Sequence, residues 1–258
     1  MSQETAGTMT LMEHLRELRT RVVYAVIGFV IAAGLGWAFH EQVFEWLMEP
    51  YRRAMQQNYP ELEHYIAFRS LIEPFVVYIK TSLAAGLILA GPWMLLQAWL
   101  FIGPGLHESE RKMAVPFLGA TLFFFFGGVA FCRYLVLEPT MSVLIDIGID
   151  SANPTIMMQD YFSFTSTMLF VFGLLFELPV VITFLAMLEL VTAAFLLKQW
   201  RMAVVITFIV AAVLTPPDPL SQTLLAVPMV ILYMASIGVV FLIERSRDRR
   251  RAREKATT

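Results

Sequence analysis

The chain alternates between six long apolar stretches and polar segments. A helix that crosses a membrane needs about 20 mostly apolar residues, because each residue adds ~1.5 Å and the hydrocarbon core is roughly 30 Å thick. The fifth stretch reaches only about 20 Å, so it either begins earlier, near Val191, or thins the bilayer locally. The pattern predicts an all-α membrane protein, with spans five and six short or irregular and six transmembrane helices at about 22–39, 75–100, 113–137, 162–188, 202–214 and 220–243.

The composition agrees with a chain that lies in lipid. Hydrophobic residues make up 58% of the 258 residues, charged residues only 16%, and the mean hydropathy is +0.66, far from the averages of soluble domains. Cys132 is the only cysteine, which excludes a disulfide framework and a cysteine-based metal site. The first apolar stretch is too long for the core of a cleaved signal peptide, so we expect it to be retained as a helix.

Lysine and arginine are concentrated on one side of the predicted membrane. Fourteen of the 19 lie before span one, between spans two and three, between spans four and five, or after span six. The loops of the opposite side carry Arg52, Arg53 and Arg69, so the positive-inside rule predicts that both termini are cytoplasmic. Lys80 and Arg133 fall near the outer ends of their spans, where we expect their long side chains to reach the interface.

This topology divides the chain into three parts. We expect the loop between His40 and Glu73 to cap the outer side, with an interfacial helix broken at Pro50. The basic tail is predicted to be a solvated topology anchor, and docking to acidic lipid is the alternative. The parts are a cytoplasmic amphipathic N-terminal helix at 1–21, a single six-span membrane domain at 22–243, and a basic cytoplasmic tail at 244–258.

The groups that an intramembrane enzyme needs are absent from the sequence. Proteolysis inside a membrane requires a nucleophile with a base, a pair of aspartates, or a zinc-binding helix. The four histidines all lie outside the spans, Asp218 has no second buried aspartate beside it, and neither HExxH nor GxSxG occurs. No phosphate-binding loop is present either. We therefore expect no enzyme activity, no cofactor, no metal ion and no nucleic-acid partner.

The segment before span one, TLMEHLRELRTR, predicts an amphipathic helix that lies on the membrane and continues into the span. Thr10 and Glu13 form a capping box at its start. Glu17 has two possible roles: it pairs with Arg21 one turn later, or it serves as an anionic docking point. It lies beside an apolar stripe at helical spacing, made of Leu11, Leu15, Leu18 and Val22.

A second acidic patch lies in the segment FIGPGLHESERK between spans two and three. Glu108 and Glu110 fall on the same side of the membrane as Glu17, so the two patches could converge. Adjacent arginines suit such a site, because each guanidinium donates two charge-assisted hydrogen bonds to a carboxylate, a geometry that lysine cannot copy. The alternative for Glu110 is local pairing with Arg111 or Lys112.

Glu177 is the most unusual residue, because the motif FGLLFELP places a carboxyl group near the middle of span four. Pro179 loosens the helix directly after it. An ionisable residue inside a membrane is a functional candidate, and a structural hydrogen bond between helices is the alternative. Gln97 and Gln222 are possible partners.

Polar side chains also gather where spans five and six meet, in the motif LTPPDPLSQTLLAVP. Asp218 is best explained as a cap of the sixth helix. Thr215 and Gln222 remain as a polar patch, and such groups often bond across helix interfaces in lipid, so a partner helix could dock there.

These motifs together resemble the TatC family over nearly the whole chain, through HLRELRTR, FIGPGL followed by ER, YFSF, FGLLFELPV, LTPPD and SQTLLAVP. The resemblance implies a six-helix cupped fold in the bacterial cytoplasmic (inner) membrane. It also implies the core receptor subunit of the twin-arginine translocase, which binds twin-arginine signal peptides at its cytoplasmic face. Its partners would be the single-span proteins TatA and TatB in an oligomeric complex that exports folded proteins by proton-motive force.

The resemblance also assigns roles to individual residues. Many relatives carry an acid where this chain has Met234, so the role of that acid is in doubt here. By motif position, Glu17 and Glu110 would contact the signal arginines, with support from Arg19 and Arg111. Glu177 would be the buried acid. Thr215 and Gln222 would form the site for the partner helix. A secondary transporter of a small solute is the alternative function, but it usually shows paired repeats and broken helices in two halves, and neither is apparent.

Overall fold

The computed structural model describes residues 11–58, 60, 66–102, 114–149, 156–214 and 219–257, and this part of the chain is almost entirely helical. The segment before α3 pairs with the start of α7, because Met158 N donates to Ala67 O at 2.8 Å. The elements are α1 (Leu11–Ala38), α2 (His40–Asn58), α3 (Glu73–Ile102), α5 (Ala114–Phe131), the π-helix η2 (Cys132–Val136), α6 (Leu137–Ile149), α7 (Met158–Leu175), α8 (Leu178–Met187), α9 (Ala193–Lys198), α10 (Trp200–Leu214) and α11 (Pro219–Thr257).

The prediction of an all-α membrane protein is confirmed, and the described residues contain five long apolar helical stretches and a shorter one. The shorter stretch is α10, whose 15 residues are about 22 Å long. It does not begin near Val191, because α9 is a separate short helix that ends in a turn at Gln199. The five long stretches are Met12–Ala38, Glu73–Phe101, Pro116–Asp146, Met158–Met187 and Gln222–Arg249.

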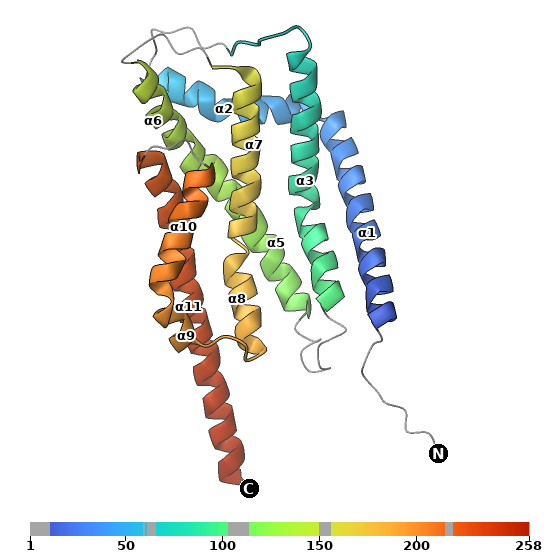
Figure 1. The fold of residues 1–258 in the computed structure, drawn as a ribbon, viewed down its shortest axis with the longest axis vertical. Coiled ribbons are helices and arrows are strands. Elements are labelled where there is room, and N and C mark those ends of the chain that lie inside the picture. Colours follow the sequence, from blue (N-terminus) through green and yellow to red (C-terminus); the bar gives the residue numbers. More distant parts are fainter. Residues whose placement is uncertain are drawn as a thin grey trace.

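The long helices stand side by side, and α2 crosses one end of them (Figure 1). α1 packs along α3, both α3 and α5 pack against α7, and α11 packs against α8 and α10. The start of α1 and the end of α11 both lie at the end opposite α2 (Figure 1). Glu13 and Glu17, near the start of α1, therefore lie far from α2 (Figure 1).

The helix α2 runs through Pro50, so the predicted break at this residue is wrong. Proline has no N–H and therefore leaves the carbonyl four residues earlier, at Trp46, without its helical donor. Arg133 supplies that donor, because its Nη2 lies 2.9 Å from Trp46 O. The same guanidinium lies 2.6 Å from a carboxylate oxygen of Glu49. A side chain from η2 thus completes the helix at the position where the sequence predicts its end.

This arrangement also corrects the prediction for Arg133 itself. Its side chain is only 2% exposed and points into the protein, with the Trp46 ring 5.1 Å and the Tyr134 ring 5.3 Å from its guanidinium. Burial of a charge is tolerated here because Glu49 pairs with it and a carbonyl accepts from it.

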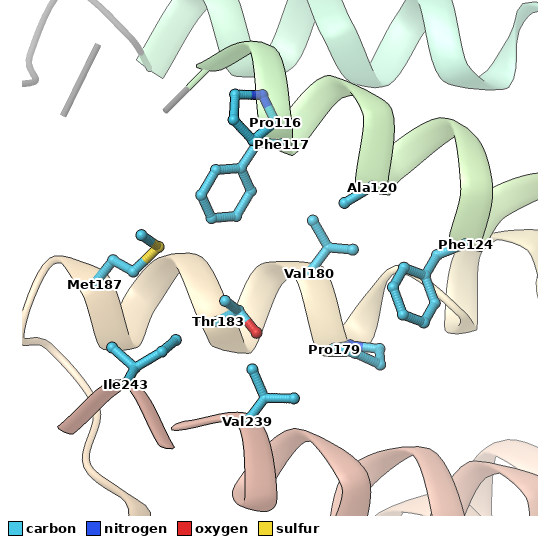
Figure 2. Close-up of a pocket in the computed structure, with 10 residues that line it drawn as sticks. All are labelled: Pro116, Phe117, Ala120, Phe124, Pro179, Val180, Thr183, Met187, Val239 and Ile243. Atoms are coloured by element: carbon cyan, nitrogen blue, oxygen red, sulfur yellow. The ribbon is translucent and has the colours of Figure 1, made fainter. Parts of the chain in front are cut away.

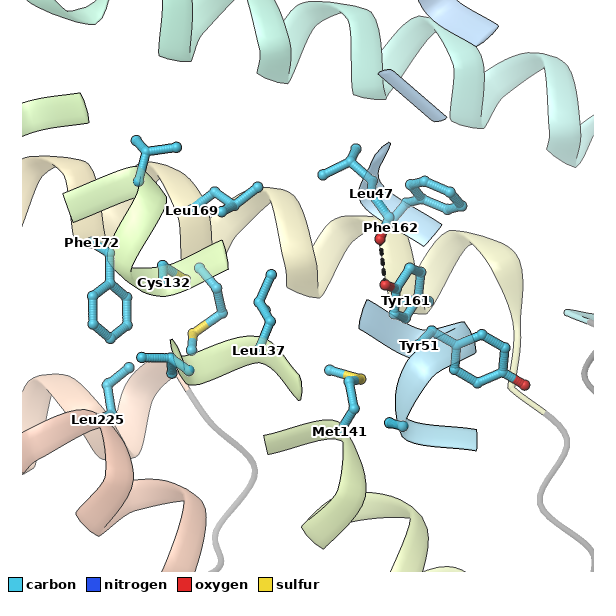
Figure 3. Close-up of a cluster of buried hydrophobic side chains, with 14 of the residues drawn as sticks. Leu47, Tyr51, Cys132, Leu137, Met141, Tyr161, Phe162, Leu169, Phe172 and Leu225 are labelled. Carbon is cyan, nitrogen blue, oxygen red and sulfur yellow. Dashed lines mark hydrogen bonds between the residues drawn. The ribbon is translucent and has the colours of Figure 1, made fainter. Parts of the chain in front are cut away.

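The main core lies between α2, α7 and the α5–η2–α6 helix (Figure 3). Tyr161 is almost fully buried, and its hydroxyl donates to Leu47 O at 2.5 Å, which ties α7 to α2. Apolar side chains from different helices fill the rest of this core, among them Phe125 and the residues Cys132, Phe162, Phe172 and Leu225 that Figure 3 labels. Since these residues come from segments distant in sequence, the core holds the spans and the cap together.

α1 and α3 approach each other through small residues. A Cβ added at Gly86 of α3 would lie 2.5 Å from Ala33 Cα of α1, and one added at Gly36 would lie 2.6 Å from Ser82 O. Small residues at such crossings let helix backbones pack closely in lipid, where the hydrophobic effect does not drive helices together.

Candidate functional site

Glu17 lies on α1 near the end of the bundle opposite α2. Its Oε1 atom accepts from Arg21 Nη2 at 3.2 Å, so the predicted pair one turn apart is present. The second oxygen, Oε2, is buried and has no hydrogen-bond partner within the described ranges. A buried carboxylate oxygen without a partner is energetically costly, so Glu17 Oε2 is available to accept a hydrogen bond from a ligand.

The first turns of α1 pack beside the last turn of α3. The His14 and Phe101 rings stack with their centroids 4.4 Å apart. The polypeptide that carries the second acidic patch begins after α3, directly beyond this stack. The patch itself, with Glu108, Glu110, Arg111 and Lys112, lies outside the described residues, as does the predicted cap Thr10. Convergence of the two patches therefore stays a prediction.

Arg19 is exposed on α1 and makes no ion pair with any other described residue. Two residues correspond to about 200° around a helix, so its side chain leaves α1 on the side away from Glu17. Any support that Arg19 gives to an anionic site at Glu17 is therefore by its charge and not by direct contact.

Glu177 lies at a break in the fourth span, between α7 and α8. The break has a local cause: Pro179 has no N–H for the carbonyl of Leu175, so the helix ends there and restarts with proline in its first turn. The Glu177 side chain is only 3% exposed. Glu177 Oε1 has no hydrogen-bond partner in the described chain, and neither does Oγ1 of the buried Thr121 of α5.

The two predicted partners of Glu177 have different outcomes. Gln97 of α3 is buried, and its Oε1 has no hydrogen-bond partner among the residues that the structure describes. Gln222 of α11 instead donates from Nε2 to Phe208 O of α10 at 2.9 Å. Gln222 therefore joins the last two spans to each other, and its hydrogen bond is to α10 and not to Glu177.

An apolar pocket of about 330 Å³ lies next to the break, between α5, α8 and α11 (Figure 2). Phe117 and Phe124 of α5 face Pro179 and Val180 of α8 across it, and Ile243 of α11 closes one end (Figure 2). The sequence gives no signal for this pocket, because its walls come from three helices that are far apart in the chain. It offers room for an apolar group near the buried acid.

The predicted partner-helix site consists of Thr215 and Gln222, where the last two spans meet. Gln222 is half-buried and bonded to α10 as described above. Thr215 and Asp218 lie outside the described residues. Met234 is 38% exposed on the surface of α11.

Two charged networks at the α2 end were not predicted. Glu49 pairs with both Arg53 and the buried Arg133, and Arg69 pairs with Asp160 at 2.5 Å. Desolvation alone would raise the pKa of the Glu49 carboxyl group, but the hydrogen bonds and positive charges of Arg53 and Arg133 outweigh it, so its pKa lies below the ordinary value. Across the described chain, no group of three His, Cys, Asp or Glu side chains could hold a metal ion.

Comparisons with known proteins cover nearly the whole chain. A family model described as Sec-independent protein translocase protein (TatC) matches residues 13–228. The chain is 34% identical to the TatC protein of Koribacter versatilis over 98% of this chain and 93% of that protein. It is 35% identical to the TatC protein of Aquifex aeolicus, over 93% of this chain and 98% of the other. A crystal structure of the twin arginine translocase receptor TatC in DDM is similar with a TM-score of 0.78 and 35% identity, over 88% of this chain and 99% of that chain.

Proposed function

This chain belongs to the TatC family, the receptor subunits of the Sec-independent (Tat) protein translocase, and we propose that it binds the paired arginines of signal peptides at the α1 end of the bundle. The observation that carries this proposal is the Glu17 carboxylate, which pairs with Arg21 through one oxygen and keeps the other buried without a partner in the described chain. A guanidinium can satisfy that oxygen with a charge-assisted hydrogen bond.

The second arginine of the signal peptide would be bound by Glu110. Arg19 and Arg111 would support the site through their positive charge, which limits the repulsion between the acidic side chains. The contact between α1 and the end of α3 supports this arrangement, because the segment that carries Glu110 leaves α3 beside His14. Lysine would bind more weakly, because its ammonium cannot form the two parallel hydrogen bonds of a guanidinium.

The proposed location is the bacterial cytoplasmic (inner) membrane, with both termini cytoplasmic. The concentration of lysine and arginine on one side supports this orientation. In this arrangement residues 1–21 form the cytoplasmic helix, 22–243 the cupped six-span domain, and 244–258 the basic cytoplasmic tail. The helix α2 then covers the outer side.

We also propose partner contacts for the last spans. Single-span TatA and TatB would dock at Thr215 and Gln222, and the oligomeric complex would export folded proteins with proton-motive force. Glu177 would be the functional buried acid of this complex, since an ionisable group inside a membrane is energetically costly and is therefore expected to have a function. The apolar surface of the last spans supports docking of another helix in lipid.

The experiment that tests the receptor site uses a photo-crosslinker at the exposed Thr20, one turn after Glu17 on α1, in the full chain in membranes, so that Glu17 and Glu110 both stay in place. It is offered signal peptides with paired arginines or paired lysines. We expect crosslinking to the arginine peptide to exceed crosslinking to the lysine peptide by roughly tenfold, the equivalent of one charge-assisted hydrogen bond. Glu17→Gln should remove this preference. Glu13→Gln, one turn earlier on the same helix, is the matched control and should retain it. Equal crosslinking of both peptides would reject the docking site.

A further inference from the structure

A polar pocket of about 240 Å³ lies between α3 and α7 near the end of the bundle that α2 covers. That volume is far more than one water needs. The polar residues that line it are Lys80 and Thr81 of α3 and Gln159, Ser163, Ser166 and Thr167 of α7. A pocket of this composition is unusual beside a hydrocarbon core, where polar groups are costly.

The hydroxyl groups on α7 are available for a ligand. Serine and threonine in a helix commonly donate to the carbonyl four residues earlier, as Ser82, Thr207 and Ser236 do here at 2.6–2.8 Å. Within the described residues, the hydroxyls of Ser163 and Thr167 make no such bond. The α7 side of the pocket thus presents free hydrogen-bond donors.

Lys80 is a cation without a counter-charge in this pocket. No carboxylate of the described chain lies within ion-pair distance of its ammonium group. The carboxylates nearest along the two helices are already used: Glu73 accepts from the backbone N–H groups of Arg69 and Gln159, and Asp160 pairs with Arg69. The positive charge of Lys80 is therefore left for a group that the chain does not supply.

The surface below the pocket is apolar. Leu83 lies one turn after Lys80 on α3 and is 45% exposed, and Leu174 lies further along α7 and is 47% exposed. A molecule that filled the pocket with an anionic group would therefore meet apolar side chains directly beneath it. This order of cation, hydroxyls and apolar surface matches an amphipathic ligand.

We propose that the pocket between α3 and α7 binds the phosphate group of one membrane phospholipid, with its acyl chains lying along the apolar surface that includes Leu83 and Leu174. Lys80 provides the counter-charge, and the hydroxyls of Ser163 and Thr167 donate to the phosphate oxygens. In the topology proposed above this is a lipid of the outer leaflet. The site lies at the other end of the bundle from Glu17 and is independent of signal-peptide binding.

A phosphate group fits better than the carboxylate of a partner helix. Lys80 is seven residues into α3, about 10 Å along the helix axis, and its flexible stem lets the ammonium rise toward the level of lipid headgroups. A phospholipid carries an anionic group and acyl chains in one molecule, so it can satisfy the ammonium and hydroxyls of the pocket and cover the apolar surface beside them. The carboxylate of a partner helix at this depth would itself be costly to place beside the hydrocarbon core.

The test is native mass spectrometry of the full chain released from nanodiscs that contain dioleoyl phosphatidylglycerol. We expect one phospholipid to remain on the wild-type chain and its occupancy to fall roughly tenfold in Lys80→Met, since one charge-assisted contact is lost. Lys198→Met is the matched control, because Lys198 is an exposed lysine of α9 outside the pocket, and it should keep the lipid. Dioleoylglycerol, which has the same acyl chains and no phosphate, should not be retained.

A second variant separates lipid binding from folding. Thr167→Val removes a pocket hydroxyl at nearly constant volume and leaves Lys80 in place, so it should lower occupancy without changing the melting temperature. Equal retention of phospholipid by wild type and Lys80→Met would overturn the proposal. Retention of dioleoylglycerol at the same level would also overturn it, as would displacement of the lipid by an acidic single-span peptide in wild type but not in Lys80→Met.

Discussion

Replacement of Gly86 by alanine tests whether the close contact between α1 and α3 holds the receptor end of α1 in place. The new Cβ would lie 2.5 Å from Cα and 2.6 Å from N of Ala33, which are backbone atoms that cannot rotate away. Carbon atoms pack at about 3.5–4.0 Å, so the two helices must separate by roughly 1 Å. Gly86→Ala is therefore a change in helix spacing.

The expected magnitude follows from two opposing effects. Overpacking of this kind costs about 1–3 kcal/mol, and alanine in place of glycine in a helix returns about 0.5–1 kcal/mol. Gly34→Ala provides the matched control on α1, because a Cβ at Gly34 meets nothing within 4 Å. The helix-propensity gain is common to both variants, so they should differ by about 1–3 kcal/mol, or roughly 2–12 °C in melting temperature.

The assay is thermal unfolding of the two purified variants in the same detergent, together with crosslinking of the paired-arginine peptide from Thr20, which leaves Glu17 in place. Gly86→Ala should melt below Gly34→Ala and crosslink less, because α1 moves away from the end of α3. Equal melting temperatures, or a higher one for Gly86→Ala, would refute the reasoning that backbone contact sets the spacing of these helices.

Four further predictions concern other parts of the molecule. Glu177→Gln should keep export activity and Glu177→Ala should lose it, because only glutamine preserves a buried hydrogen-bonding group; wild-type export by the alanine variant would contradict this. Glu49→Gln should lower the melting temperature more than Arg133→Met, since it leaves a buried guanidinium without its carboxylate. The pKa of the Glu49 carboxyl group is lowered on folding, so this carboxylate should stabilise the protein above the ordinary pKa of 4.5 and lose that effect as the pH falls below 4.5. The melting temperature, measured from about pH 3.5 to pH 7, should therefore change less with pH in Glu49→Gln than in the wild type. Leucine at Thr215 or at Gln222 should reduce copurification of single-span partners, and unchanged recovery would argue against that interface.

The number and order of the spans could be predicted from the sequence because length and apolarity alone decide whether a helix can cross a membrane. The stretch 75–100 lies inside α3, and the short fifth stretch corresponds to α10. The helix that begins with α5 continues through η2 to Ile149, well beyond the predicted end at 137. Polar residues such as Glu138 look like a loop in a hydropathy pattern, yet a helix can extend past the hydrocarbon without being apolar.

The site residues divide in the same way. The pair between Glu17 and Arg21 and the break near Glu177 could be predicted, because helical spacing and Pro179 are local features. The role of Arg133 could not, since it depends on a carbonyl that Pro50 frees in a helix more than 80 residues earlier. The proline alone predicts a break in α2, but Arg133 donates a hydrogen bond to the carbonyl of Trp46 that the proline leaves without a donor, so the helix continues.

The length of α11 sets how far its basic end can act. The helix has 39 residues, about 58 Å, and continues beyond Ile243 for about 21 Å as a projecting arm (Figure 1). Surface charge is screened within about 8 Å at physiological ionic strength, so in the topology proposed above only the first turn or two after Ile243, with Arg245, would lie within electrostatic reach of lipid headgroups. Arg247 in this stretch is already paired with Glu189 at 2.9 Å. We therefore expect the basic positions later in the sequence to act on soluble molecules that approach the membrane and not on lipid.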